Sequence, residues 1–186
     1  MDETVDKSAK QKAGHYEVIG ETYAKVEFFE HHWNPYSRFL DHDKVDLLLR
    51  RMIHGVPVYR EVQVKFGKLY TVGPAWERAI FDVTSWRFFR PNEFDKALPG
   101  LFLAYVLSED AGYRGDIFIF PVRDFSALIA RAPVAGANHR VYISRCKDNP
   151  SRWVLRCQSR FTEINDETTA DVSKYRRAFH LLEPST

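Results

Sequence analysis

The sequence has few cysteines and no long apolar run, and these absences exclude several classes of protein. Cys146 and Cys157 are the only two cysteines, too few for a disulfide framework and not spaced as in structural zinc sites. We expect two reduced, partly buried thiols, as in a cytosolic protein. No apolar run approaches the ~20 residues of a membrane span, and residues 1–13 lack the apolar centre of a secretory signal. The sequence therefore predicts a cytoplasmic protein with no membrane partner.

Two common enzyme signatures are also missing. The chain contains no glycine-rich phosphate loop and no Ser, His and Asp arrangement typical of nucleophilic catalysis. What is present is an ordinary globular composition, with 45% hydrophobic and 28% charged residues among 186. We therefore predict one domain over residues 14–186, preceded by a polar, disordered leader over residues 1–13.

The net charge of +2 hides a local excess of positive charge. Between Asn138 and Arg160, six cations stand against Asp148 alone; they are Arg140, Arg145, Lys147, Arg152, Arg156 and Arg160. All but one are arginines, whose planar fork suits phosphate oxygens. The segment is either a phosphate-contacting surface or a solvated strand face, and the charge alone does not decide between them.

Hydrophobic periodicity predicts the secondary structure along most of the chain. Residues 14–33 read as a helix with an apolar stripe of Ile19, Tyr23, Val26, Phe29 and Trp33, which ends at Asn34-Pro35. Residues 76–90 are either a helix or irregular structure, and the pattern does not decide between these two. The other predicted elements are strands at 36–40, 45–50, 57–66, 101–107, 117–122, 141–146 and 153–158, and short helices at 124–131 and 172–179.

This order of elements predicts an α/β fold. We expect a central mixed β-sheet flanked by helices, with an extra C-terminal β-hairpin formed by residues 141–146 and 153–158. The turn His54-Gly55-Val56-Pro57 predicts an antiparallel hairpin of the strands at 45–50 and 57–66. The apolar run Leu101–Leu107 is typical of a strand that is buried on both faces.

One strand carries the residues with the clearest chemical meaning. Side chains alternate along a strand, so Glu61, Gln63 and Lys65 share one face while Val62 and Val64 share the other. The hairpin can bring Asp46 of the neighbouring strand to the same end. Carboxylate and amide oxygens are ligands for Mg²⁺ or Mn²⁺, and an adjacent lysine can position water or stabilise phosphoryl charge. The alternative is a half-exposed polar strand face without a metal.

The order of these motifs resembles that of a known nuclease superfamily. Gly20-Glu21-x-x-Ala24-x-x-x-Phe28, Val45-Asp46-Leu47-Leu48 and Val62-Gln63-Val64-Lys65 are similar to the motifs of the PD-(D/E)XK, or restriction-endonuclease-like, superfamily. The closest branches in character are the Holliday-junction resolvases and the type IV restriction enzymes. The resemblance covers about residues 14–68 and implies a restriction-endonuclease-like fold.

The resemblance also assigns roles to individual residues. It makes Asp46 a catalytic and metal-binding aspartate, Gln63 the equivalent of the usual Glu or Asp, and Lys65 the catalytic lysine. It adds the backbone carbonyl of Val64 as a metal ligand and Glu21 as the acidic residue of the first helix. The implied activity is Mg²⁺- or Mn²⁺-dependent hydrolysis of DNA by an endonuclease, in many relatives a homodimer.

The neutral Gln63 leaves two interpretations open. It removes a negative charge from the metal seat, and Glu61, two residues earlier on the same face, can supply the missing carboxylate. Alternatively, catalysis has been lost and the chain is a DNA-binding module on the same fold. In either case Arg140, Arg145, Arg152, Arg156 and Arg160 are the predicted contacts to the DNA backbone.

A second segment mixes aromatic and cationic residues. Trp86-Arg87-Phe88-Phe89-Arg90 alternates the two types in the way that base-stacking surfaces do. An aromatic core segment with exposed arginines explains the same pattern.

Overall fold

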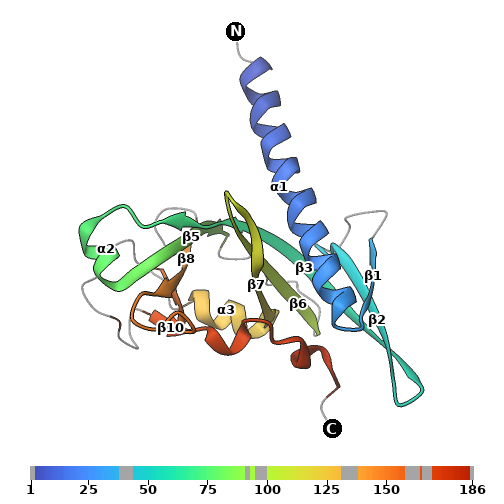
Figure 1. Ribbon diagram of the computed structural model, residues 1–186. Coiled ribbons are helices and arrows are strands. Elements are labelled where there is room, and N and C mark those ends of the chain that lie inside the picture. The colour runs from blue at the N-terminus through green and yellow to red at the C-terminus, as the bar shows by residue number, and fades with distance from the viewer. Residues whose placement is uncertain are drawn as a thin grey trace.

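The computed structural model describes residues 3–37, 44–90, 93–94, 100–130, 138–157, 164 and 169–184, with side chains from Gly14 onward (Figure 1). Its elements are α1 (Glu3–Glu30), β1 (Asn34–Ser37), β2 (Leu47–Ile53), β3 (Val56–Lys68), β4 (Tyr70–Thr71), α2 (Ala75–Ile80), β5 (Phe81–Phe89), β6 (Leu101–Glu109), β7 (Gly112–Pro121), α3 (Val122–Ala130), β8 (His139–Cys146), β9 (Trp153–Arg156), β10 (Thr169–Asp171) and the 3₁₀ turns η1 (Ser173–Tyr175) and η2 (Phe179–Leu182). None of the described helices combines the length and apolarity that crossing a membrane requires.

The strands form two five-stranded sheets, whereas the sequence predicts one central mixed sheet with an extra C-terminal hairpin. The first sheet has the order β1-β2-β3-β6-β7 and is mixed, because β3 and β6 are parallel while its other pairs are antiparallel. This confirms an α/β fold with a mixed sheet. The second sheet has the order β10-β9-β8-β5-β4 and is antiparallel throughout. Its centre is the pair β5–β8, whose partners lie far apart along the chain and leave no local sequence signal.

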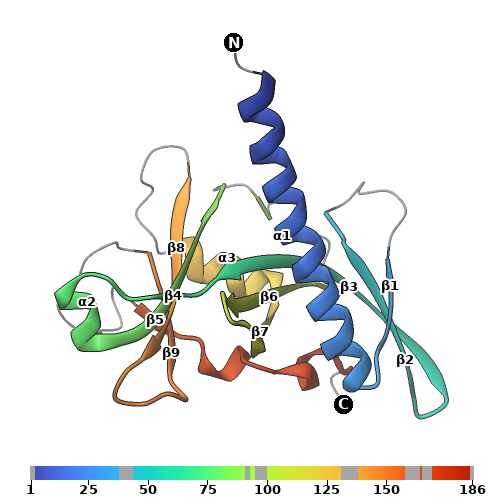
Figure 2. The same ribbon diagram turned by 45° about the horizontal axis from the view of Figure 1, so that its top comes forward.

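The two sheets pack face to face and share a hydrophobic core. Leu103, Tyr105 and Phe118 of the first sheet meet Val141 and Trp153 of the second sheet in this core. The opposite face of the first sheet is covered by α1 and η2. In Figures 1 and 2, α1 lies beside β1–β3, whereas α2 lies at the far end of the molecule. As predicted, β6 is buried on both faces, since nearly all of its residues are buried.

Helix α1 begins earlier than predicted and buries a different face. It starts at Glu3 and not at Gly14, so the predicted leader falls largely within the helix. Val26 and Phe29 of the predicted apolar stripe are exposed, while Ala24 and Phe28 are fully buried. Small residues explain the choice of face: a Cβ atom at Gly20 would lie 2.9 Å from Cβ of Phe66, so the helix approaches β3 closely there.

The hairpin of β2 and β3 confirms the sequence prediction. The strands pair antiparallel from Leu47↔Val62 to Ile53↔Val56. His54 and Gly55 form the turn with φ values of 50° and 79°, the left-handed conformation that tight hairpin turns require. Of the strand predicted at 36–40, Ser37 ends β1, and residues 38–40 lie outside the described part of the chain.

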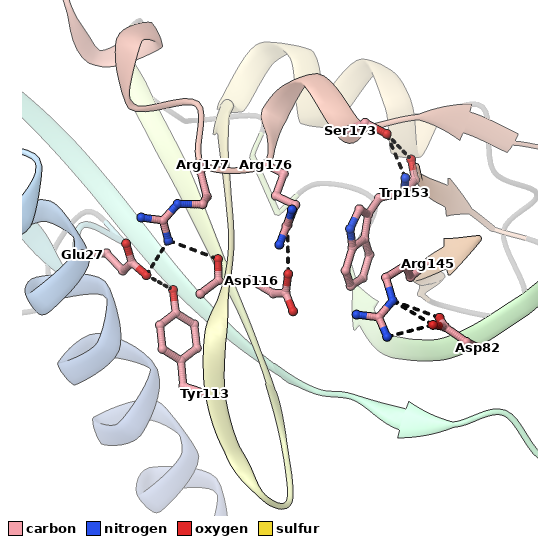
Figure 3. Close-up of polar contacts among 10 residues, drawn as sticks. Glu27, Asp82, Tyr113, Asp116, Arg145, Trp153, Ser173, Arg176 and Arg177 are labelled. Atoms are coloured by element: carbon pink, nitrogen blue, oxygen red, sulfur yellow. Dashed lines mark hydrogen bonds and ion pairs between the residues drawn. The ribbon is translucent and has the colours of Figure 1, made fainter. Parts of the chain in front are cut away.

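Two arginines of the C-terminal segment bind carboxylates of β7 and α1. The helix predicted at 172–179 is instead the pair of 3₁₀ turns η1 and η2. Between them, Arg176 Nε donates to Asp116 Oδ1 at 2.9 Å and Arg177 Nη1 donates to Glu27 Oε1 at 2.9 Å (Figure 3). Tyr113 donates its hydroxyl hydrogen to the same Glu27 oxygen at 2.6 Å. These bonds tie the chain end to α1 and β7.

The cysteines are free, in line with the sequence prediction. Cys146 is buried and Cys157 is half-buried. Burial raises the pKa of each thiol to about 11, so both are protonated near neutral pH.

Candidate functional site

The candidate site lies at the beginning of β2, where this strand starts to pair with β3. The backbone N–H of Asp46 donates to the carbonyl of Val62 at 3.0 Å, and the backbone N–H of Val64 donates to Asp46 Oδ2 at 2.6 Å. An extended residue directs its N–H and C=O toward the same neighbouring strand, so the Val64 carbonyl faces the side on which Asp46 lies. Two oxygen donors from different strands therefore face one edge of the sheet.

Gln63 is the second buried feature of this site. The β2–β3 register begins at the pair Leu47↔Val62, and Gln63 is the next residue of β3 after this pair. The side chain is only 4% exposed, and its Oε1 is buried without a hydrogen-bond partner. A buried acceptor without a partner is costly, commonly by about 1–3 kcal/mol. A bound cation or water at this oxygen would remove that cost.

Lys65 follows on the same face of β3. Its Nζ lies 3.7 Å from Glu93 Oε1, and both side chains are more than four-fifths buried. Glu93 is in turn held by the backbone, since Arg90 N–H donates to its other carboxylate oxygen at 3.2 Å. The ion pair with Glu93 restrains the Lys65 side chain on this face of β3.

The parallel strand β6 brings a tyrosine next to this lysine. Tyr105 pairs with Lys65 in the β3–β6 register, is fully buried and has no hydrogen-bond partner for its hydroxyl. Burial raises the pKa of Tyr105 to about 12, although the positive charge of Arg87 acts in the opposite direction. The hydroxyl is thus a neutral group in the core beside the candidate site.

The two other predicted carboxylates are placed differently. Glu61 lies on the Gln63 and Lys65 face, pairs with Leu48 of β2 and is half-buried. Glu21 lies on α1, which packs against the face of the sheet that carries Val62 and Val64. Its contact is Lys25 Nζ, at 3.5 Å. Glu21 is thus on the helix side of the sheet, and Lys65 faces the second sheet.

The oxygen atoms of this region are of kinds that hard divalent cations bind, although they carry little negative charge. Within the described residues, no three His, Cys, Asp or Glu side chains gather closely enough to hold a metal ion. The donors at the site are instead one carboxylate, one amide oxygen and one backbone carbonyl, from Asp46, Gln63 and Val64. Oxygen donors of these three kinds are typical ligands of Mg²⁺ and Mn²⁺, which keep several waters in addition.

The predicted DNA-contacting arginines differ in their surroundings. Arg156 is fully buried and ion-paired with Glu77, which leaves none of its surface for phosphate. Arg145 donates to both carboxylate oxygens of Asp82, at 3.1 and 2.9 Å (Figure 3). Arg152 and Arg140 have more accessible guanidinium groups, and Arg160 lies outside the described residues. The prediction that Arg156 contacts DNA is therefore wrong. Side chains alternate along β9, and that of Arg156 points into the buried region beneath α2.

Some residues of this site could not be found from the sequence. Glu93 follows a segment without clear periodicity, and Tyr105 sits in a continuous apolar run. Only the parallel pairing of β3 with β6 brings Tyr105 to Lys65.

Scans against known protein families, curated proteins and solved structures returned no match for this chain. Its function therefore has to be inferred from the residues described above.

Proposed function

We propose that this chain is a divalent-metal-dependent DNA endonuclease of the restriction-endonuclease-like type. The observation that carries the proposal is the hydrogen bond from the Val64 amide to Asp46. It holds a carboxylate next to the backbone of the Gln63–Val64–Lys65 triplet, and a carboxylate near a lysine supports a role in metal-dependent phosphodiester hydrolysis. The proposal includes DNA as the partner, a cytoplasmic location and a homodimer that cuts both strands.

Asp46, the Val64 carbonyl and Gln63 Oε1 are the groups that would hold Mg²⁺ or Mn²⁺. When bound, the ion supplies Lewis-acid chemistry: it neutralises phosphate charge and lowers the pKa of a coordinated water. Asp46 contributes the full negative charge in this set, and Gln63 contributes an acceptor that is otherwise without a partner. Glu61, on the same face of β3, is the nearest additional carboxylate along that strand, and Glu21 would have to act from the helix side.

Lys65 acts on the substrate in this proposal. Glu93 lies 3.7 Å from its Nζ and holds the lysine side chain in position. A fixed ammonium group can orient the attacking water and stabilise the extra negative charge on the phosphate as the bond breaks. A role in proton abstraction would require loss of that charge, so stabilisation of developing charge is the role proposed.

The neutral Gln63 also supports a second candidate, a DNA-binding module without catalysis. A site with one carboxylate attracts a divalent cation less strongly than a site with two. In that case Asp46 and Lys65 serve only the packing of β2 on β3.

The test is cleavage of supercoiled plasmid and of branched DNA with Mg²⁺, Mn²⁺ or EDTA. Wild-type protein is compared with Asp46→Ala, Lys65→Ala and, as a control, Lys68→Ala. Lys68 is also a partly exposed lysine of β3, paired with Asp110 outside the candidate site. The proposal expects metal-dependent nicking that both site variants lose and the control keeps.

DNA binding in EDTA separates the remaining outcomes. If wild-type protein does not nick but binds DNA with strong salt dependence, the non-catalytic binding module is correct. If it neither nicks nor binds, both candidates are wrong.

A further inference from the structure

A second site lies on the outer face of the second sheet, which is turned away from the first. Val141 and Ile143 of β8 point into the core between the sheets, so Arg140 and Tyr142 point outward. In the β5–β8 register Trp86 pairs with Tyr142, and Phe88 pairs with Arg140. Trp86 is 41% and Phe88 is 50% exposed. Helix α2 covers only the neighbouring part of this face, around Phe81, Cys146 and Val154.

Arg140 lies among these aromatic rings. Its guanidinium carbon is 4.5 Å from the ring centroid of Trp86, 5.2 Å from that of Tyr142 and 5.7 Å from that of Phe88. Its Nε is buried without a hydrogen-bond partner. Among the described residues Arg140 has no ion-pair partner, so the face presents a flat cation whose charge is not neutralised.

A pocket of about 410 Å³ adjoins the guanidinium. Its walls include Trp76, Trp86, Tyr142 and Tyr70, together with the hydroxyl-bearing Thr71 and Thr84; Arg140 and Glu77 complete its charged lining. The volume lies in the range of small-ligand sites, and aromatic walls with a few polar groups suit a planar heterocycle.

The second charged residue of the pocket is already neutralised. Glu77 is buried and pairs with Arg156, which lies over the Tyr142 ring at 4.1 Å. Thr84 and Ser144 hydroxyl groups bond to each other at 2.8 Å between the two strands. The net charge presented by the pocket is therefore that of Arg140, and it favours an anionic ligand.

We infer that this face binds single-stranded DNA. Exposed aromatic rings on a sheet provide stacking surfaces for unpaired bases, and an arginine that has no carboxylate partner in the described part of the chain provides a contact for the backbone phosphate. One base occupies the pocket beside Trp86, the next stacks on Phe88, and Arg140 contacts the phosphate between them. A duplex does not fit, because its bases stack on each other and their faces are not available.

This inference goes beyond the proposed nuclease activity and does not depend on it. Arg140 and Trp86 lie on a different sheet from Lys65 and face away from the shared core. Binding is measured in EDTA, so that a failure of cleavage and a failure of strand binding are observed separately.

The experiment is fluorescence anisotropy of a labelled oligodeoxythymidylate with the full chain. The variants are Trp86→Leu, Arg140→Ala and Arg140→Lys, with Tyr59→Leu as the control. Tyr59 is a 50% exposed aromatic residue of β3 in the first sheet. Circular dichroism of each variant checks that it is folded. Competition with duplex of the same sequence and with thymidine monophosphate identifies the form of ligand that binds.

The expected result is a loss of about tenfold or more in affinity for Trp86→Leu and Arg140→Ala, with Tyr59→Leu unchanged. Arg140→Ala should also reduce the salt slope by about 0.7, the value for one phosphate of a single strand, whereas Arg140→Lys should keep the slope but bind more weakly. Equal binding by wild type and folded Trp86→Leu would overturn the inference. So would preference for duplex, or competition by the free nucleotide as effective as that by the oligomer.

Discussion

At the scale of single residues, Gln63 is the most informative position in the candidate site. Its amide oxygen is buried without a hydrogen-bond partner. Under the nuclease proposal Gln63 completes a weakly charged metal site, and under the alternative proposal of a DNA-binding module no metal binds there. The substitution Gln63→Glu replaces the amide nitrogen by oxygen and keeps the shape of the side chain, so it distinguishes between these two possibilities.

The Gln63→Glu variant should be less stable than wild type without a metal ion, and Mg²⁺ should stabilise it strongly. Burying a carboxylate in place of the amide should lower stability by about 2 kcal/mol, or about 4–8 °C in Tm. Saturating Mg²⁺ should recover most of that loss, and the Mg²⁺-induced rise in Tm should exceed that of wild type. Thermal melting with Mg²⁺ and with EDTA measures both effects. An equal Tm for the variant in the two buffers would show that no cation binds beside residue 63.

His31 makes the stability of the chain dependent on pH. Its ring stacks on Phe179 with centroids 3.6 Å apart, and Arg177 Nη2 lies 3.2 Å from its Nε2. Burial, and secondly the positive charge of Arg177, lower the pKa of His31, while Glu27 and Glu30 oppose the shift. The folded state binds the proton less readily than the unfolded state, so stability is lost as the pH falls below about 6.5.

Urea unfolding at several pH values tests this dependence. Wild type should lose more stability than His31→Gln between about pH 7.5 and 5.5, across the ordinary titration of histidine. His32→Asn, a change at the exposed neighbour with φ of 66°, serves as the control and should keep the wild-type slope. Parallel curves for wild type and His31→Gln would contradict the assignment.

At the scale of elements, the two sheets approach most closely where β3 passes β5. A Cβ atom at Gly67 would lie 2.5 Å from Ser85 Oγ, 2.8 Å from Leu107 Cδ2 and 2.9 Å from Tyr105 Cε2. Since none of these neighbours can move without disturbing the core, glycine is required at this crossing.

Gly67→Ala should therefore cost about 1–3 kcal/mol of stability, as overpacking in a core does. Gly14→Ala is the matched control, because nothing lies within 4 Å of a Cβ atom there. In helix α1 that change should stabilise by about 0.5–1 kcal/mol. Chemical denaturation of both variants measures the two effects, and a neutral Gly67→Ala would show that the strands are not in contact at this residue.

The elements also show which features can be predicted from the sequence. The β2–β3 hairpin depends on a local turn at His54-Gly55, and β6 on a continuous apolar run, so both were predictable. Strand β5 was not, because its outward Trp86 and Phe88 are aromatic and exposed, which hides the alternation. The prediction of which face of α1 is buried was also wrong, because Gly20 and Ala24 lie against the sheet on account of their small size and not of their hydrophobicity.

Within the candidate site the same distinction holds. Asp46, Gln63 and Lys65 lie on one local hairpin, so their proximity follows from alternation and register. Glu93 and Tyr105 reach Lys65 only through long-range packing, which no periodicity encodes. Arg156 was assigned to the surface from its charge, but its pairing with Glu77 places it in the interior.

At the scale of the whole molecule, the candidate site and the aromatic face belong to different sheets. The residues of the candidate site lie along β2 and β3, while Trp86 and Arg140 belong to β5 and β8, on the side of the molecule where α2 lies (Figure 2). One chain could then hold a single strand on one sheet and cut DNA at the other. Arg152, whose side chain is 40% exposed and lies 3.7 Å from Asp171, precedes β9 of the second sheet. Lys147 of the predicted basic segment is also exposed.

The most direct test of the nuclease proposal is the rate of metal-dependent plasmid nicking by Lys65→Ala relative to Lys68→Ala, at DNA concentrations that saturate both. The proposal predicts a rate at least about 100-fold lower for Lys65→Ala, with equal DNA affinity, because the lysine stabilises charge that develops only during cleavage. Equal nicking rates for the two variants, or no nicking by wild type with Mg²⁺ or Mn²⁺, would contradict it.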